Sequence, residues 1–293
     1  MNDQNIIIIA QQNWETTIGT NPRNMAREFA KNNRVLYINM PLDVSTVLRE
    51  HEEPTVKKRL RVLLGLEEGL VKAEPNVWVY TTGVLLLSAN WLTSRPLFSA
   101  VNNLNAWLLA RSIRKAADAA GFDSFYLLQD GLIFPGLELK RLLKPVKFIY
   151  NLRDYVMAVP YFQRHGPWME AALMKQADVV SANSAYLRDY AREHNPSSYD
   201  IGQGCVLSLY QADAVYDRPA DLPPAGAPII GYTGYLTEIR LDIELLVTIA
   251  RQRPQWNLVL IGPEDEAFKR SALHQRPTYT SWAASRPTSC RLT

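Results

Sequence analysis

Cysteine is scarce in this sequence, which also lacks the features that mark several common classes of protein. Only Cys205 and Cys290 occur among 293 residues, which excludes a disulfide framework and a cysteine-based metal site. The apolar run IIIIA at 6–10 is not preceded by basic residues and is too short for a signal peptide or a membrane span. The sequence therefore predicts a cytoplasmic protein of a reducing compartment.

An excess of charge of one sign is also lacking over most of the chain. The last segment, 276–293, holds Arg276, Arg286 and Arg291 and no acid. These three residues account for the formal net charge of +3, because the other 29 Lys and Arg residues match the 29 Asp and Glu residues. A formally neutral segment 1–275 argues against nucleic acid as a partner.

Short apolar strands and amphipathic helices alternate along the first two thirds of the chain. Strands are expected within 5–12, 34–41, 76–83, 124–131, 146–155, 178–184 and 199–205. Helices are expected within 25–33, 97–121, 136–144, 167–177 and 185–194. This alternation predicts an α/β fold with a doubly wound parallel sheet.

A proline-rich segment divides the pattern into two domains. DRPADLPPAGAP at 217–228 is typical of a linker, so 1–216 is predicted to be an N-terminal α/β domain. Strand, helix and strand patterns restart in 229–275. Since a domain of this class needs about 100 residues, this second, Rossmann-like domain is expected to be incomplete.

A basic stretch, EPTVKKRLRVLLGLEEGLVK at 53–72, allows two interpretations. It predicts either a solvated helix that packs its Leu and Val face on the domain, or a basic amphipathic helix that touches a membrane surface through 55–72. Nearby Glu residues offset the Lys and Arg cluster and favour the first interpretation.

Several motifs in order resemble one family of enzymes. IIGYTGYLTEIRLDIELLVTIARQRPQWNLVLIGP at 229–263 is similar to the opening of the donor-binding domain of GT-B glycosyltransferases, particularly the retaining family 4 (glycosyl transferases group 1) type. VLYINMP at 35–41, ANSAYLRDYA at 182–191 and GQGC at 202–205 resemble the acceptor domain. Val206 departs from the family, in which Asp is usual at this position.

The resemblance implies GT-B architecture and transfer of a sugar from a nucleotide-sugar donor, with retention, to a sugar or lipid-linked acceptor. It places the reaction in cell-envelope or exopolysaccharide synthesis, in the cytoplasm or on the inner membrane face, without a metal or other cofactor. Two alternatives stay open: a non-catalytic or degenerate nucleotide-sugar-binding remnant, and a GT-B-type sugar-nucleotide epimerase.

The candidate donor site follows the first strand of the second domain. Gly234 lets the backbone approach a ligand, Thr237 and Glu238 precede a helix, and Arg240 supplies a permanent charge. Backbone N–H groups at a helix N-terminus and a cation are suited to the charge of a leaving nucleotide diphosphate. The alternative is a plain loop with a helix cap.

Four residues of the first domain are candidates for the same site. Gly19 and Thr20 lie in the loop after the first strand, where the family places a glycine against donor and acceptor; the alternative is a turn glycine. Asp130 and Asp154 each follow an apolar strand, where a carboxylate can orient or deprotonate an acceptor hydroxyl. The alternative for both is a helix cap or a solvated turn.

The last segment does not continue the family pattern. One set of codons for RPTYTSWAASRPTSCRLT, read two bases later, encodes PNVHFLGRKPPDELPAY, which resembles the sequence that relatives carry at this point. We therefore interpret 276–293 as an aberrant, disordered tail produced by a frameshift, which leaves the edge of the last strand exposed. The resemblance then implies a truncated chain of little or no activity, because two donor-site glutamates of the family are missing.

Overall fold

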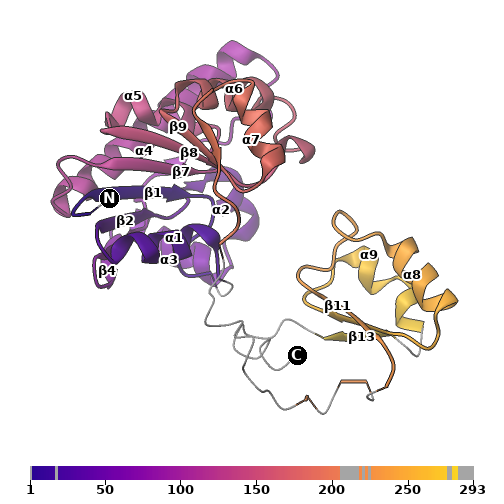
Figure 1. Ribbon diagram of the computed structural model, residues 1–293. Helices are drawn as coiled ribbons and strands as arrows, with labels where there is room; N and C mark the ends of the chain where they lie inside the picture. Colours follow the sequence, from indigo (N-terminus) through magenta and orange to yellow (C-terminus); the bar gives the residue numbers. More distant parts are fainter. Residues whose placement is uncertain are drawn as a thin grey trace. The chain divides into compact units, whose positions relative to one another are not determined.

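The computed structural model describes residues 2–16, 19–204, 218–219, 222–223, 226–275 and 279–282. The chain divides into two compact units, Met1–Cys205 (unit 1) and Val206–Thr293 (unit 2), which are described separately (Figure 1). Of the predicted linker 217–228, the structure describes 218–219, 222–223 and 226–228, and the predicted boundary at 216 lies outside the described residues.

Unit 1 is built on an eight-stranded sheet in the order β10-β9-β8-β7-β1-β2-β5-β4. All neighbouring strands are parallel except the edge pair β4 and β5. The strands are β1 (Asn5–Ala10), β2 (Arg34–Ile38), β4 (Leu70–Glu74), β5 (Val77–Tyr80), β7 (Tyr126–Asp130), β8 (Lys147–Leu152), β9 (Val179–Ala182) and β10 (Ser198–Asp200). A separate two-stranded ladder joins β3 (Leu42–Asp43) and β6 (Leu85–Leu86).

Helices cover both faces of this sheet. Side chains alternate along β1, so that Ile6 and Ile8 pack with α1 (Asn21–Ala30), while Ile7 and Ile9 pack on the opposite face. That second core contains side chains of α4 (Arg95–Ala119), α5 (Leu139–Leu143), α6 (Gly166–Gln176) and α7 (Ala185–Arg192). The predicted doubly wound sheet is therefore confirmed.

The strand order reverses at β1. The chain runs outward from β1 through β2 and β5, and then returns to place β7 on the other side of β1. In open α/β sheets the crevice outside the carboxyl ends of the strands at such a switch point is the usual ligand site. The topology thus predicts a ligand site among the segments that follow β1, β7 and β8.

The basic segment 53–72 contains less helix than its pattern predicts. The helix α3 (Pro54–Leu63) ends before Gly65, whose φ of 71° turns the chain, and β4 then begins at Leu70. The short helix α2 (Val44–Glu50) precedes α3 in the chain. No helix in the described parts of the chain is long and apolar enough to cross a membrane.

Unit 2 contains a three-stranded parallel sheet in the order β11-β12-β13. Its elements are β11 (Ile229–Thr233), α8 (Ile243–Gln252), β12 (Asn257–Ile261), α9 (Glu266–Lys269) and β13 (Tyr279–Trp282). β13 differs from the disordered tail expected for 276–293, because YTSW is rich in residues that favour strands and it pairs with the edge of β12. The other residues of that segment lie outside the described parts.

Candidate functional site

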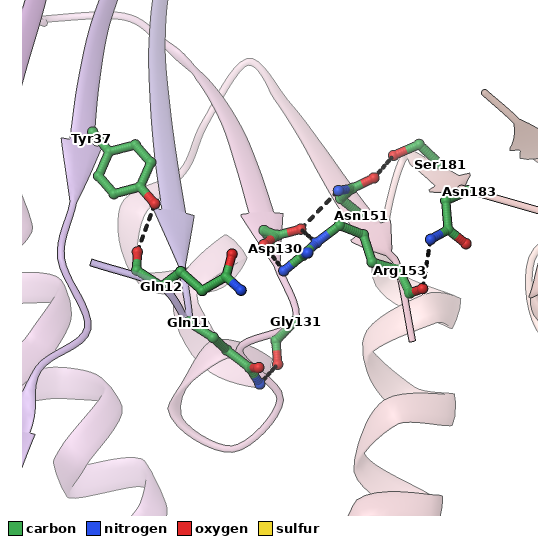
Figure 2. Close-up of polar contacts among 9 residues, drawn as sticks. All are labelled: Gln11, Gln12, Tyr37, Asp130, Gly131, Asn151, Arg153, Ser181 and Asn183. Carbon is green, nitrogen blue, oxygen red and sulfur yellow. Dashed lines mark hydrogen bonds and ion pairs between the residues drawn. The ribbon is translucent and has the colours of Figure 1, made fainter. Parts of the chain in front are cut away.

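Asp130 and Arg153 form an ion pair at the carboxyl ends of β7 and β8 (Figure 2). Nε and Nη2 of Arg153 donate to the two carboxylate oxygens of Asp130 at 2.6 and 2.8 Å. Asp130 is fully buried, and burial raises the pKa of its carboxyl, an effect that the Arg153 guanidinium opposes. The ion pair therefore fixes the direction of the guanidinium at this edge of the sheet.

A chain of hydrogen bonds extends from this pair across the neighbouring strands (Figure 2). The Ser181 hydroxyl donates to Oδ1 of Asn151, and Nδ2 of Asn151 donates to Asp130, each at 2.8 Å. Nδ2 of Asn183 donates to the backbone oxygen of Arg153 at 2.7 Å. Three successive strand ends thus hold Arg153 in place.

Tyr37 brings β2 into the same cluster. Its hydroxyl donates to the backbone oxygen of Gln12 at 2.6 Å. Burial raises the pKa of Tyr37 and the Asp130 carboxylate adds to the rise, whereas the Arg153 guanidinium and the Thr20 hydroxyl oppose it. The phenol therefore stays protonated, as a donor at the carboxyl end of the central strands.

The structure separates the four candidates of unit 1. Thr20 is buried at the start of α1, close to Tyr37, whereas Gly19 is exposed and an added Cβ would meet only Arg23, at 3.9 Å. Asp130 is held by Arg153 and faces no solvent, so it positions another residue. Asp154 is exposed at the carboxyl end of β8, where a carboxylate can reach a ligand.

A cavity of about 900 Å³ lies next to this cluster, within unit 1. Gln11 after β1, Met40 after β2 and Leu132 after β7 line it, so it adjoins the switch point. Nε2 of Gln11 donates to the backbone oxygen of Gly131, which links the cavity wall to the loop that follows Asp130. The apolar part of its lining includes Leu86, Phe98, Ile133, Phe134 and Phe162.

Asp43 supports the polar side of this cavity. Its carboxylate accepts hydrogen bonds from the hydroxyl groups of Ser45, Thr46 and Ser88, at 2.7 to 2.8 Å, and caps α2. Burial opposes ionisation of Asp43, but the bonds from Ser45, Ser88 and Thr46 outweigh it and lower its pKa to about 2. Asp43 is thus an ionised structural group.

We expect Asp43→Ala to lower the free energy of unfolding of unit 1 by about 0.5–2 kcal/mol, the range for loss of an N-cap. A depressed folded-state pKa stabilises the protein above the unfolded value, near 3.8, and the gain is lost as pH falls towards about 2. Urea unfolding from pH 6 to pH 2 should therefore show a smaller acid-dependent loss in the variant. Parallel pH profiles for the two proteins would contradict this role.

In unit 2, the loops after β11 and β12 are tied together through their backbones. The N–H of Gly234 donates to the oxygen of Ile261, that of Leu236 to Pro263, and that of Asp265 to Leu236, each at 2.9 Å. The two strand ends consequently present one continuous backbone surface.

Asp265 bonds to two of the predicted donor residues, Thr237 and Glu238, and orients them. Its carboxylate accepts from the N–H of Phe268 at 2.9 Å and of Glu238 at 3.1 Å. The Phe268 N–H, followed by the Thr237 hydroxyl, lowers the pKa of Asp265, so it remains an anion. Thr237 is therefore turned towards Asp265 and is itself buried.

The predicted phosphate loop does not lead directly into a helix N-terminus. α8 begins at Ile243, and the Asp242 carboxylate accepts the Leu245 N–H at 3.0 Å, so a protein acid occupies the helix end. Arg240 is exposed in the loop before it. The part of the expected donor site that remains is the backbone near Gly234 together with the Arg240 charge.

Sequence reasoning missed Gln11 and Arg153, which directly follow β1 and β8, the same signal that singled out Asp130 and Asp154. It also missed the role of Asp265, which lies four residues after the end of β12 and carries no such signal. Among the described residues, no group of three or more His, Cys, Asp or Glu is arranged to hold a metal ion.

Comparison with known proteins identifies the architecture. No family model and no curated protein matches the sequence. Among solved structures, HepE of Anabaena in complex with UDP-glucose matches 97% of this chain and 70% of its own, at 14% identity and a TM-score of 0.58. HepE with UDP and glucose gives a TM-score of 0.59 at 13% identity, covering 99% of this chain and 72% of its own.

A UDP-glucosyltransferase from Polygonum tinctorium that glucosylates indoxyl also matches, with a TM-score of 0.51 and 12% identity over 97% of this chain and 72% of its own. These neighbours share the GT-B architecture, and at such identities they establish the fold alone. The predicted GT-B fold class is thus confirmed.

Proposed function

We propose that this chain is a glycosyltransferase of the retaining family 4 type that binds a nucleotide sugar and transfers the sugar to an acceptor. The supporting observation is the fold match, which covers nearly the whole chain and includes a protein solved with UDP-glucose, with UDP and glucose, and with UDP. We further propose a role in cell-envelope or exopolysaccharide synthesis, in the cytoplasm and without a metal or other cofactor.

The donor is proposed to bind unit 2 at the tied loops. The backbone at Gly234 can approach a diphosphate closely, Thr237 and Glu238 shape the loop through Asp265, and Arg240 can pair with phosphate oxygens. Such a transfer mainly requires groups that compensate the charge that develops on the leaving diphosphate.

The acceptor is proposed to bind unit 1 at the carboxyl ends of its strands. Asp154 is exposed there and is our candidate to orient or deprotonate an acceptor hydroxyl. Asp130 acts through Arg153, whose Nη1 has no partner in the part of the chain that the structure describes. Gly19 and Thr20 contribute the loop that leads into α1.

Contact with a membrane surface through 55–72 is a further proposal. Leu64 and Leu66 expose 70% and 63% of their surface in the turn after α3. Lys57, Lys58 and Arg61 form exposed ion pairs with Glu52, Glu15 and Glu67, pairs of small energy that can exchange for lipid phosphates.

A binding and turnover assay tests the proposed function. UDP, GDP, ADP and their glucose derivatives are added to the full chain, and the melting temperature and the sugar products are recorded. We expect one nucleotide series to raise the melting temperature. Release of nucleoside diphosphate with a transferred or free sugar supports a transferase, whereas a new sugar nucleotide without release would identify an epimerase. Binding without any product would identify a non-catalytic protein.

We expect Arg240→Gln to weaken binding of the preferred nucleoside diphosphate about 10-fold, because a charge-assisted contact with phosphate is lost. Arg251→Gln is the matched control, since Arg251 is also exposed in unit 2 but lies in the last turn of α8. Isothermal titration of both variants checks this. Equal affinities in the two variants would remove Arg240 from the donor site.

A further inference from the structure

The cavity of unit 1 has a polar lining that is largely occupied by its own hydrogen bonds. Asn105 donates to and accepts from the backbone of Leu87, at 2.8 and 2.9 Å, and Asn102 donates to Phe134 at 2.8 Å. Asp43 is saturated by hydroxyl and amide donors, as described above. These groups hold the wall in place and have little capacity left for a ligand.

Aromatic side chains provide much of the surface that remains. Phe134 lies 5.6 Å from Phe98, 5.6 Å from Phe162 and 5.7 Å from Tyr161, measured between ring centroids. A sugar in this cavity would exchange its bonds to water for contacts with aromatic and aliphatic carbon, which is unfavourable. An apolar group gains from the same exchange.

The exposed part of the cavity lining, which we call its mouth, comprises Arg49, Trp91, Tyr161 and Arg164. It carries positive charge and amphipathic rings. Arg49 and Arg164 both line the cavity, both are exposed, and neither pairs with a carboxylate of the described residues. Trp91 and Tyr161, 71% and 56% exposed, lie in the same lining. Arginine is suited to phosphate, and exposed Trp and Tyr are typical of surfaces that meet lipid head groups.

Two loops are bound together to form this mouth. Nη1 of Arg164 donates to the backbone oxygens of Asn90 and Trp91, at 3.1 and 2.8 Å, and His165 bonds to that of Leu92 at 2.8 Å. His165 is buried and stacks on Phe98 at 3.7 Å. The mouth is therefore a preformed part of the fold.

We propose that this cavity binds the apolar chain of a phosphate-bearing lipid, with the phosphate at Arg49 and Arg164. This inference rests on the proposed function only in calling that lipid the acceptor. The volume of about 900 Å³ is within the range of small-molecule sites and suits a chain of moderate length. Oδ1 of Asn90, buried and without a partner among the described residues, can accept a hydrogen bond from a hydroxyl of the same ligand.

Binding of farnesyl phosphate to the full chain, measured by isothermal titration below its aggregation concentration, tests this proposal. We expect saturable binding of one molecule per chain, farnesol to bind about 10-fold more weakly because it lacks the phosphate, and inorganic phosphate to compete poorly. No binding, equal binding of farnesol, or displacement by inorganic phosphate at similar concentration would each overturn the proposal. UDP-glucose binding is measured separately, so failure here leaves the proposed function intact.

Two matched substitutions locate the site. Leu87→Asp places a charge in the cavity lining at a side chain that is 45% exposed, and we expect at least a 10-fold loss of farnesyl phosphate affinity. Leu104→Asp makes the same change at a side chain that is 46% exposed on α4, outside the lining, and should leave the affinity unchanged. Circular dichroism confirms that both variants fold, and equal affinities would place the ligand elsewhere.

Arg49→Gln tests the charge at the mouth, with Lys175→Gln, an exposed cation near the end of α6, as its control. We expect the first variant to bind farnesyl phosphate about 3- to 10-fold more weakly and farnesol unchanged. The control should bind both molecules as the wild type does. A loss of farnesol binding equal to that of farnesyl phosphate would contradict a phosphate contact.

Discussion

Asp130→Ala is expected to lower the free energy of unfolding of unit 1 by about 3–5 kcal/mol, because it leaves the Arg153 guanidinium without its partner in a poorly solvated site. Asp130 is fully buried, and the Arg153 side chain is only 17% exposed. Asn151 would also lose the acceptor of its 2.8 Å hydrogen bond. Urea unfolding, followed by far-ultraviolet circular dichroism, measures the change.

Two further variants separate the ion pair from the general effect of mutation. Asp154→Ala removes an exposed carboxylate 24 positions after Asp130. We expect it to lower the free energy of unfolding by about 0.5 kcal/mol or less. The double variant Asp130→Ala, Arg153→Met should recover part of the lost stability, since no unpaired charge is left. If the double variant is no more stable than Asp130→Ala, the unpaired guanidinium is not the cause.

Gly262→Ala should destabilise unit 2 by about 3 kcal/mol or more and abolish nucleotide binding. Gly262 has a φ of 147°, and a Cβ there would overlap the carbonyl group of Gly234. Backbone strain and overpacking each cost about 1–3 kcal/mol, and both act at the loop proposed to hold the diphosphate. Hydrogen exchange in α8 and the thermal shift with UDP together report the loss of structure and of binding.

Gly231→Ala is the matched control for this substitution. Gly231 lies in β11 of the same unit, at a backbone conformation open to any residue, with no atom within 4 Å of an added Cβ. We expect it to be neutral or slightly stabilising, since alanine restricts the unfolded chain. Similar losses in the two variants would mean that unit 2 responds to any change of glycine, and that the contact of Gly262 with Gly234 is not special.

The sheet of unit 1 was largely predictable from sequence because buried parallel strands appear as continuous apolar runs. IIIIA at 6–10 is one example and VLYI at 35–38 another, and the alternation of such runs with helices along the chain predicted a doubly wound sheet. The helix expected over 53–72 was too long, because an apolar and basic pattern continues through Gly65 into an antiparallel edge strand. A single sequence does not reveal which edge of the sheet such a segment joins.

The candidate site was predictable as a set of positions, but its pairings were not. Strand ends located Asp130 and Asp154 from sequence alone, because the carboxyl ends of parallel strands meet at one edge. The contacts of Asp130 with Arg153 and Asn151 follow from the register of β7 against β8, in which Asp130 lies opposite Asn151. The cavity is formed by segments near Leu87, Phe134 and Arg164, whose proximity is a product of the tertiary fold.

The proposal that this chain binds a nucleotide sugar has one decisive experiment: isothermal titration of the full chain with UDP-glucose. Binding of one molecule per chain with a dissociation constant of about 1 μM to 1 mM, the usual span for enzyme substrates, is the expected result, with weaker binding in Arg240→Gln. Heats indistinguishable from dilution for UDP-glucose, and likewise for the GDP and ADP sugars, would contradict the proposal that this chain binds a nucleotide sugar.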